Sequence, residues 1–225
     1  MRIHEVVPSG TVRGAVVVIQ EAFGVNEHIE DVATRFAAAG YHAVAPDLFH
    51  RQGGVTFGYD GDFGPILEVM MQLDDASVLA DLDAAIDVLH QRGFTDDRIG
   101  AVGFCFGGRA TFLLALERAL GGAVGFYGGG IVHGRGPKFA ALAPRSSTLR
   151  TPWLGLFGDA DAGIPIDEVE ALRDALESAP VPTEIVRYPD APHGFHCDRR
   201  ADFRPEAAAD AWERTLHWLD AHLAP

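Results

Sequence analysis

The sequence has little cysteine, no long hydrophobic segment and a shortage of positive charge. Only two of its 225 residues are cysteine. A chain of this length can bury enough apolar surface to fold without disulfides. Cys105 and Cys197 are therefore predicted to be free thiols in a reducing, cytoplasmic setting.

Membranes and nucleic acids are disfavoured as partners. No segment approaches the roughly 20 apolar residues of a spanning helix, and Met1–Gly10 lacks the uninterrupted apolar run of a signal peptide. The formal net charge of −14 would repel nucleic acid and anionic lipid. We expect a cytoplasmic protein that binds a small molecule, as a monomer or small homo-oligomer.

Short β-branched runs alternate with helical patterns along the chain. Gly14–Ile19 is apolar throughout, which is typical of a strand covered on both faces. Five further strands are predicted on the same grounds, namely Tyr41–Ala45, Arg98–Phe104, Gly122–Phe126, Pro152–Phe157 and Glu184–Tyr188. Helices are predicted over Asn26–Ala39, Asp75–Gln91, Arg109–Leu120 and Glu206–His222. A further helix is predicted to carry Val169, Leu172 and Leu176 on one face. This order predicts a single α/β domain over residues 1–225, with a mostly parallel sheet and helices on both faces.

The segment His50–Gly64, HRQGGVTFGYDGDFG, interrupts this alternation with five glycines and no clear period. A loop of that length in a compact domain is usually functional or mobile. It follows a predicted strand, and ligands of open α/β sheets bind at the carboxyl ends of strands. It is interpreted as a loop near the pocket, with a tolerated surface insertion as the alternative.

One of the two cysteines lies in the stretch GFCFG, Gly103–Gly107. A nucleophile on a sharp turn between strand and helix needs small residues two positions before and after it, hence the pattern G-x-nucleophile-x-G. The serine version occurs nowhere in the chain. Cys105 is therefore a candidate nucleophile, and a buried cysteine at a tight turn is the alternative.

A nucleophile of this kind needs a histidine and an acid, in the chain order nucleophile, acid, histidine. His193 lies in the loop after the last predicted strand, with His196 as its rival. Asp159 and Asp161 follow the preceding strand, and either could orient an imidazole. The spacing leaves that choice open, because the other aspartate would cap a helix or form the turn.

Taken together, these segments resemble the dienelactone hydrolase family of α/β-hydrolases over most of the chain. The matching stretches are QEAFGVN (20–26), PDLF (46–49), GFCFGG (103–108), GFYG (125–128), GDAD (158–161) and HGF (193–195). The resemblance implies an α/β-hydrolase fold with Cys105 as nucleophile and His193 as base. It assigns the acid to Asp161, because the family's G-x-x-D with a proline four residues later falls on Gly158, Asp161 and Pro165.

The resemblance also implies a reaction. Glu21 would contact the resting thiol and help to form the thiolate, which is the attacking species. Backbone N–H groups of Phe106 and Ala22 would form the oxyanion hole. An ester or lactone would pass through a thioester that water then hydrolyses, as in a carboxymethylenebutenolidase, with no metal or organic cofactor.

The chain departs from the family where the substrate binds. Family members hold a substrate carboxylate with arginines, one after P-D-L-[FY] and one shortly after the histidine. Here no lysine or arginine lies between Gln52 and Gln91, and the residue four positions after His193 is Cys197. Tyr127 and Arg51 are the candidate substrate-binding residues, with Arg199 and Arg200 nearby in the sequence. Loss of a bidentate carboxylate clamp weakens anionic ligands, so we expect a neutral or differently oriented ester or lactone.

Three other functions were weighed. His193, His196 and Cys197 lie within five residues, but no H-E-x-x-H or C-x-x-C completes a zinc site, so no metal is expected. Gly128–Gly130 matches neither nucleotide-binding glycine motif. A non-catalytic protein that binds a small ligand on the same fold is the alternative function, and the complete set of Cys105, Asp161 and His193 argues against it.

Overall fold

Seven strands form one sheet in the order β1-β3-β2-β4-β5-β6-β7. The computed structural model describes residues 1–224. All neighbouring strands are parallel except β1 and β3, which pair antiparallel with Ile3 opposite Pro46. The strands are β1 (Ile3–Val6), β2 (Gly14–Ile19), β3 (Tyr41–Pro46), β4 (Ile99–Phe104), β5 (Gly122–Phe126), β6 (Trp153–Gly158) and β7 (Thr183–Tyr188). The α/β-hydrolase fold predicted from the sequence is confirmed.

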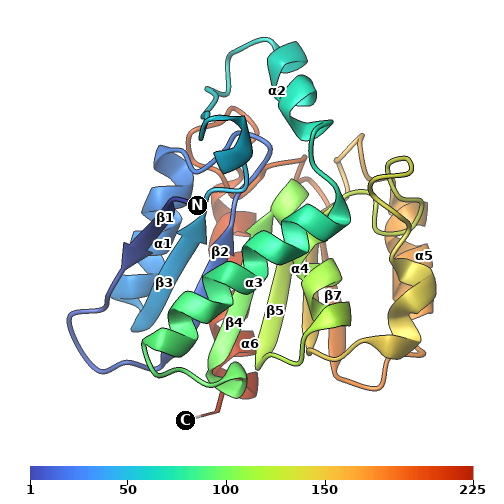
Figure 1. The fold of residues 1–225 in the computed structure, drawn as a ribbon. Coiled ribbons are helices and arrows are strands. Elements are labelled where there is room, and N and C mark those ends of the chain that lie inside the picture. Colours follow the sequence, from blue (N-terminus) through green and yellow to red (C-terminus); the bar gives the residue numbers. More distant parts are fainter. Residues whose placement is uncertain (225) are drawn as a thin grey trace.

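Helices cover both faces of this sheet. They are α1 (Glu27–Ala38), α2 (Phe63–Met70), α3 (Asp75–Gln91), α4 (Phe106–Glu117), α5 (Ile166–Leu176) and α6 (Pro205–His222). In Figure 1, α3 and α4 lie in front of the sheet, α1 and α6 lie behind it, and α2 stands apart at the top. Of the described helices, none is long and apolar enough to cross a membrane.

The apolar runs become strands because both faces of the sheet are covered. Every residue of β2, β4 and β5 is buried, so these strands lack the polar alternation of a half-exposed sheet. The helix ends follow local chemistry. The Asn26 side chain accepts a hydrogen bond from the Ile29 N–H at 3.2 Å, and Asp74 and Ser77 form a capping box at the start of α3.

Two elements differ from the sequence-based expectation. β1 has no apolar pattern because it is a half-buried edge strand, held only by β3. The Gly-rich segment is not irregular throughout, since His50–Gln52 forms a 3₁₀ turn and α2 begins at Phe63 after Asp62 accepts a hydrogen bond from the Gly64 N–H. Gly54 and residues 56–59 of this segment border a separate surface cavity of about 470 Å³.

Candidate active site

The strand β4 runs directly into helix α4 through Cys105. This residue has φ 54° and ψ −113°, a conformation that non-glycine residues rarely adopt. Its N–H donates to the Phe126 carbonyl at 3.0 Å, and its carbonyl accepts from the Arg109 N–H. The helix therefore starts one residue after the cysteine, earlier than the sequence pattern indicated, and the thiol is left half-exposed at the end of the sheet.

Glycines around the cysteine make this turn sterically possible. A Cβ atom on Gly103 would lie 2.2 Å from the Gly107 carbonyl oxygen. A Cβ atom on Gly107 would lie 2.4 Å from the Ile19 carbonyl oxygen. Both distances are far below van der Waals contact, so the spacing G-x-C-x-G reflects backbone atoms that approach one another closely.

His193 and Asp161 meet at the same edge of the sheet. Asp161 lies in the loop after β6 and His193 in the loop after β7, and Nδ1–H of the imidazole donates to Oδ2 of Asp161 at 2.6 Å. Asp161 is buried, whereas His193 is partly exposed. Asp159 points elsewhere and accepts two hydrogen bonds, at 2.7 and 2.9 Å, from the guanidinium of Arg187. The geometry thus pairs the imidazole with Asp161 and gives Asp159 a structural ion pair.

The electrostatics of His193 favour its charged form. Burial opposes the imidazolium, but the charge of the Cys105 sulfur, together with hydrogen bonds to Asp161 and Cys105, raises the pKa of His193 to about 10. An imidazolium beside the cysteine stabilises the thiolate, the form that attacks a carbonyl carbon. Thiol and imidazole are therefore placed to share a proton.

Two backbone N–H groups lie close to the thiol and are available to an anion. Phe106 is the first residue of α4 and Ala22 lies just after β2, and both border the cavity that contains Cys105. Over residues 1–224, neither N–H donates to a protein acceptor. The N-terminal end of a helix attracts negative charge, so this pair is suited to a carbonyl oxygen that gains charge.

The cavity over the thiol has a volume of about 610 Å³. Cys105, Asp161 and His193 lie in one part of it. Apolar side chains form much of the remaining wall, namely Phe63, Leu67, Met70, Met71, Phe106 and Phe139. Phe63, Leu67 and Met71 of the α2 region are also largely exposed, so they present apolar surface toward the opening.

Two arginines reach this cavity, and sequence reasoning identified neither. Arg109 is buried and its charge is used, because it pairs with Asp75 and donates to the Ala140 carbonyl. Arg135 is exposed, packs over Gly129 and Gly130, and has no ion pair within residues 1–224. Asp202 borders the same cavity. Arg109 lies on α4, and Arg135 lies in the 129–142 segment, which carries no motif.

The structure does not bring the two sequence-predicted substrate residues to this cavity. Arg51 lies in the 3₁₀ turn after β3 and donates to both carboxylate oxygens of Asp81, at 2.6 and 2.8 Å. Tyr127 has φ 38° and is fully buried, with its ring centroid 5.0 Å from that of His193. Neither borders the cavity. Arg51 forms an ion pair with Asp81 instead, and Tyr127 packs against the imidazole of His193.

Arg199 and Arg200 are also engaged outside the cavity. Arg199 pairs with Glu27 at 3.1 Å. Arg200 pairs with Asp202 at 3.0 Å and lies 3.8 Å from Oε1 of Glu21. Neither guanidinium borders the cavity over the thiol.

Glu21 is completely buried next to Arg200. It accepts a hydrogen bond from the Tyr59 hydroxyl at 3.0 Å, and burial raises the pKa of its carboxyl group. The contacts found for Glu21 involve Tyr59 and Arg200 rather than Cys105.

The run from His193 to Cys197 does not converge on one point. His193 faces the cavity with its Nδ1 bonded to Asp161. His196 is buried and stacks on Phe104, with ring centroids 5.2 Å apart. Cys197 is buried next to Glu21 and His28, which come from other segments. Closeness in sequence therefore does not make a metal site of these three residues.

Comparison with known proteins places these observations in a family. The sequence model of the "Dienelactone hydrolase family" matches residues 5–223. A "Putative carboxymethylenebutenolidase" of Methylorubrum extorquens is 39% identical over 91% of this chain and 70% of its own length. A "Probable 2-oxo-3-(5-oxofuran-2-ylidene)propanoate lactonase" of Bradyrhizobium is 32% identical over 93% of this chain and 84% of its own length. The crystal structure of a "Putative Dienelactone Hydrolase" from Klebsiella pneumoniae superposes with a TM-score of 0.87 at 37% identity, covering 96% of this chain and 91% of that one.

Proposed function

The chain belongs to the dienelactone hydrolase family and is a hydrolase of that type, and from this we propose that it cleaves neutral, largely apolar esters or lactones through Cys105, His193 and Asp161. The observation that carries the proposal is the 2.6 Å hydrogen bond between His193 and Asp161 beside Cys105, at a cavity whose wall is largely apolar. The three residues come from three loops that meet at one edge of the sheet, which is the arrangement a nucleophile, base and orienting acid require.

The first half of the reaction forms a thioester. The Cys105 thiolate attacks the carbonyl carbon, and the carbonyl electron pair moves onto oxygen. The resulting anion accepts hydrogen bonds from the N–H groups of Phe106 and Ala22. When the tetrahedral intermediate collapses, the C–O bond to the leaving group breaks and the alkoxide takes the proton from Nε2 of His193. In a lactone the new hydroxyl remains attached to the acyl group.

The second half releases the acid. His193, now neutral and oriented by Asp161, removes a proton from a water molecule that attacks the thioester carbon. The second tetrahedral intermediate expels the Cys105 thiolate, and the imidazolium is restored beside it. Tyr127 packs against the imidazole ring and helps to hold it in place, so we assign Tyr127 a positioning role.

The cavity wall supports an apolar substrate. Much of the surface beyond the triad is formed by Phe63, Leu67 and Phe139 with neighbouring methionines. Arg109 is neutralised by Asp75 and Asp202 by Arg200, which leaves Arg135 as the one arginine at the cavity without an ion pair in the described chain. A hydrophobic acyl or alkyl group gains about 0.8 kcal/mol for each methylene that it buries.

Trapping of the acyl-enzyme tests this mechanism. The protein is mixed with p-nitrophenyl hexanoate, quenched in acid within the first turnover, digested and analysed by mass spectrometry. We expect hexanoyl on the peptide that contains Cys105, in wild type and in Cys197→Ala, and on no peptide of Cys105→Ala. The Cys197 variant is the matched thiol control.

Two results would contradict the proposal. Turnover that survives in Cys105→Ala would remove the thiol from the chemistry. A folded wild-type protein that binds esters without releasing p-nitrophenol would instead support the non-catalytic binding function.

A further inference from the structure

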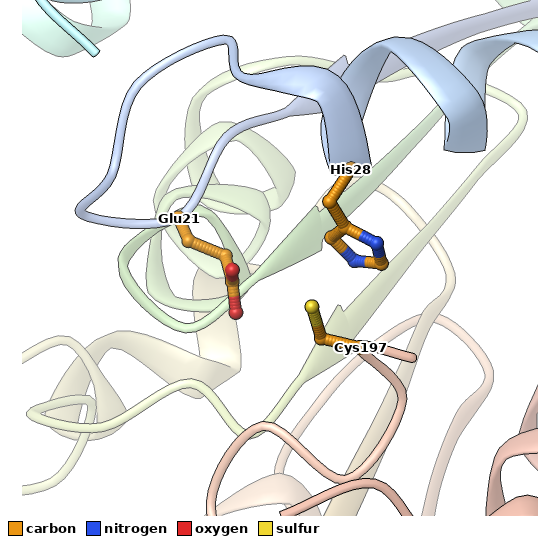
Figure 2. A group of neighbouring side chains, drawn as sticks. All are labelled: Glu21, His28 and Cys197. Carbon is orange, nitrogen blue, oxygen red and sulfur yellow. The ribbon is translucent and has the colours of Figure 1, made fainter. Parts of the chain in front are cut away.

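Glu21, His28 and Cys197 point toward one another in the interior, although they come from distant parts of the chain. Figure 2 shows Glu21 in the loop after β2, His28 in α1 and Cys197 in the loop that follows the catalytic histidine. A carboxylate oxygen, an imidazole nitrogen and the cysteine sulfur all lie within 4.8 Å of one another. The three residues are exposed by 0, 1 and 0%, so solvent does not satisfy their polar atoms.

Much of the hydrogen-bonding capacity of this cluster is unused. Oε1 of Glu21 and both ring nitrogens of His28 are buried without a hydrogen-bond partner over residues 1–224. Asp198, the nearest acid to Nδ1 of His28, lies 3.8 Å away, which is too far for a hydrogen bond. A buried polar atom left unpaired is costly. Oε1 of Glu21 and one ring nitrogen of His28 could share a single missing partner.

We propose that Glu21, His28 and Cys197 bind one thiophilic divalent cation of the zinc class. Thiolate and imidazole select zinc-like ions over magnesium or calcium, and a carboxylate is a common additional ligand. In tetrahedral zinc sites neighbouring ligand atoms lie about 3.3–3.7 Å apart, as follows from bond lengths near 2.0–2.3 Å. The cluster therefore needs to contract by at most about 1.5 Å.

Neighbouring groups are consistent with this site. Both ring nitrogens of His28 lack a hydrogen-bond partner within residues 1–224, and a neutral imidazole nitrogen is a common metal ligand. The hydroxyl of Tyr59 donates to Glu21 at 3.0 Å and also interacts with Cys197, so it contacts two of the three proposed ligands. The site is separate from the cavity over Cys105, since none of its three residues borders that cavity.

Arg200 works against binding of the cation. Its guanidinium lies 3.8 Å from Oε1 of Glu21 and neutralises that carboxylate. A cation must therefore compete with Arg200 and displace the proton of the Cys197 thiol. Removing the guanidinium charge should strengthen metal binding, and raising the pH should do the same.

Cobalt titration of the Cys105→Ala protein tests the proposal without requiring hydrolysis, because this variant has a single thiol. We expect one equivalent of Co²⁺ to bind and to produce a sulfur-to-cobalt charge-transfer band. Cys105→Ala/Cys197→Ala should lose the band. Removing a group that only hydrogen-bonds to a metal ligand weakens metal binding about 10–100-fold, so His28→Leu in the Cys105→Ala background should weaken it by at least that much.

An opposite-sign variant and a second readout protect the test against misfolding. Arg200→Gln in the Cys105→Ala background should bind Co²⁺ more tightly. Zn²⁺ should raise the unfolding temperature of Cys105→Ala but not of the double variant, because only the native site binds the ion. Absence of the band in folded Cys105→Ala, or equal binding by Cys105→Ala/Cys197→Ala, would overturn the proposal. Neither result bears on the triad.

Discussion

Nδ1 of His193 donates to Oδ2 of Asp161 at 2.6 Å, whereas Asp159, two residues earlier, is bound by Arg187. The two aspartates occupy one turn, and only their orientation separates their roles. We expect Asp161→Asn to lower kcat by about 10²–10⁴-fold, because the amide no longer holds the imidazole in the required tautomer. Steady-state kinetics on a p-nitrophenyl ester measures this.

Asp159→Asn is the matched control for that substitution. It breaks the pair with Arg187 and should cost about 1 kcal/mol of unfolding free energy, with kcat within about twofold of wild type. Equal losses of kcat in the two variants would contradict the assignment of Asp161 as the acid.

The charge state of His193 should depend on the cysteine. Burial opposes the charged ring, but the attraction of the Cys105 sulfur and the bond to Asp161 raise its pKa to about 10, so His193 is protonated at pH 7. Cys105→Ala removes the sulfur and should lower the pKa of His193, so the ring loses its proton at a lower pH. An NMR titration of the imidazole measures the shift. Cys197→Ala should leave this pKa in place, and an unchanged value in Cys105→Ala would argue against a thiolate–imidazolium pair.

The apolar wall next to α2 should set acyl-chain preference. Leu67 borders the cavity and is largely exposed, so Leu67→Ser should have little effect on folding. We expect kcat/KM for p-nitrophenyl hexanoate to fall about 5- to 10-fold, since roughly 50 Å² of apolar contact is worth about 1.3 kcal/mol, while the value for the acetate stays unchanged. Val7→Ser, an exposed position away from the cavity, is the control. An equal fall in kcat/KM for the hexanoate and the acetate would indicate that the acyl chain of the substrate does not contact α2.

Arg135 should raise kcat/KM for substrates that carry a carboxylate. Wild type is expected to prefer a neutral hexanoate ester to its ω-carboxylated counterpart, because most of the cavity wall is apolar and Arg135 is exposed. Arg135→Gln should lower kcat/KM for the carboxylated ester alone, by about 5- to 10-fold. Arg51→Gln, which breaks the pair with Asp81, should not change the ratio of kcat/KM between the two esters. A preference of wild type for the carboxylated ester would refute the neutral-substrate assignment.

The turn at Cys105 should tolerate no side chain at Gly103. Because its Cβ would lie 2.2 Å from a backbone oxygen, Gly103→Ala should cost about 3 kcal/mol or more in unfolding free energy. Gly58→Ala, where nothing lies within 4 Å of the added atom, should change stability by less than about 1 kcal/mol. Urea denaturation measures both, and a stable Gly103→Ala would mean that the turn can relax.

Local patterns predicted the fold well where burial imposes a uniform environment. Five strands are covered on both faces, so their apolar runs are unambiguous, namely β2, β3, β4, β5 and β6. β1 and α2 were missed for the opposite reason. An edge strand of four half-buried residues and a helix of eight residues in a Gly-rich segment carry too few apolar positions for a period to appear.

The sequence by itself determined the strand–helix order and the chemical types at the ends of β4, β6 and β7, because the G-x-C-x-G turn and the loop positions of Asp161 and His193 are properties of short segments. The resemblance to the family already favoured Asp161 over Asp159, and the tertiary structure pairs Asp161 with the imidazole and Asp159 with Arg187. Only the tertiary structure moved Arg51 to Asp81, buried Tyr127 next to the imidazole and brought Arg135 to the cavity. It also joined Glu21, His28 and Cys197 at one point. The physical reason is that the direction of a side chain depends on backbone torsions and on neighbours far away in sequence, and these are set only when the sheet and its loops pack together.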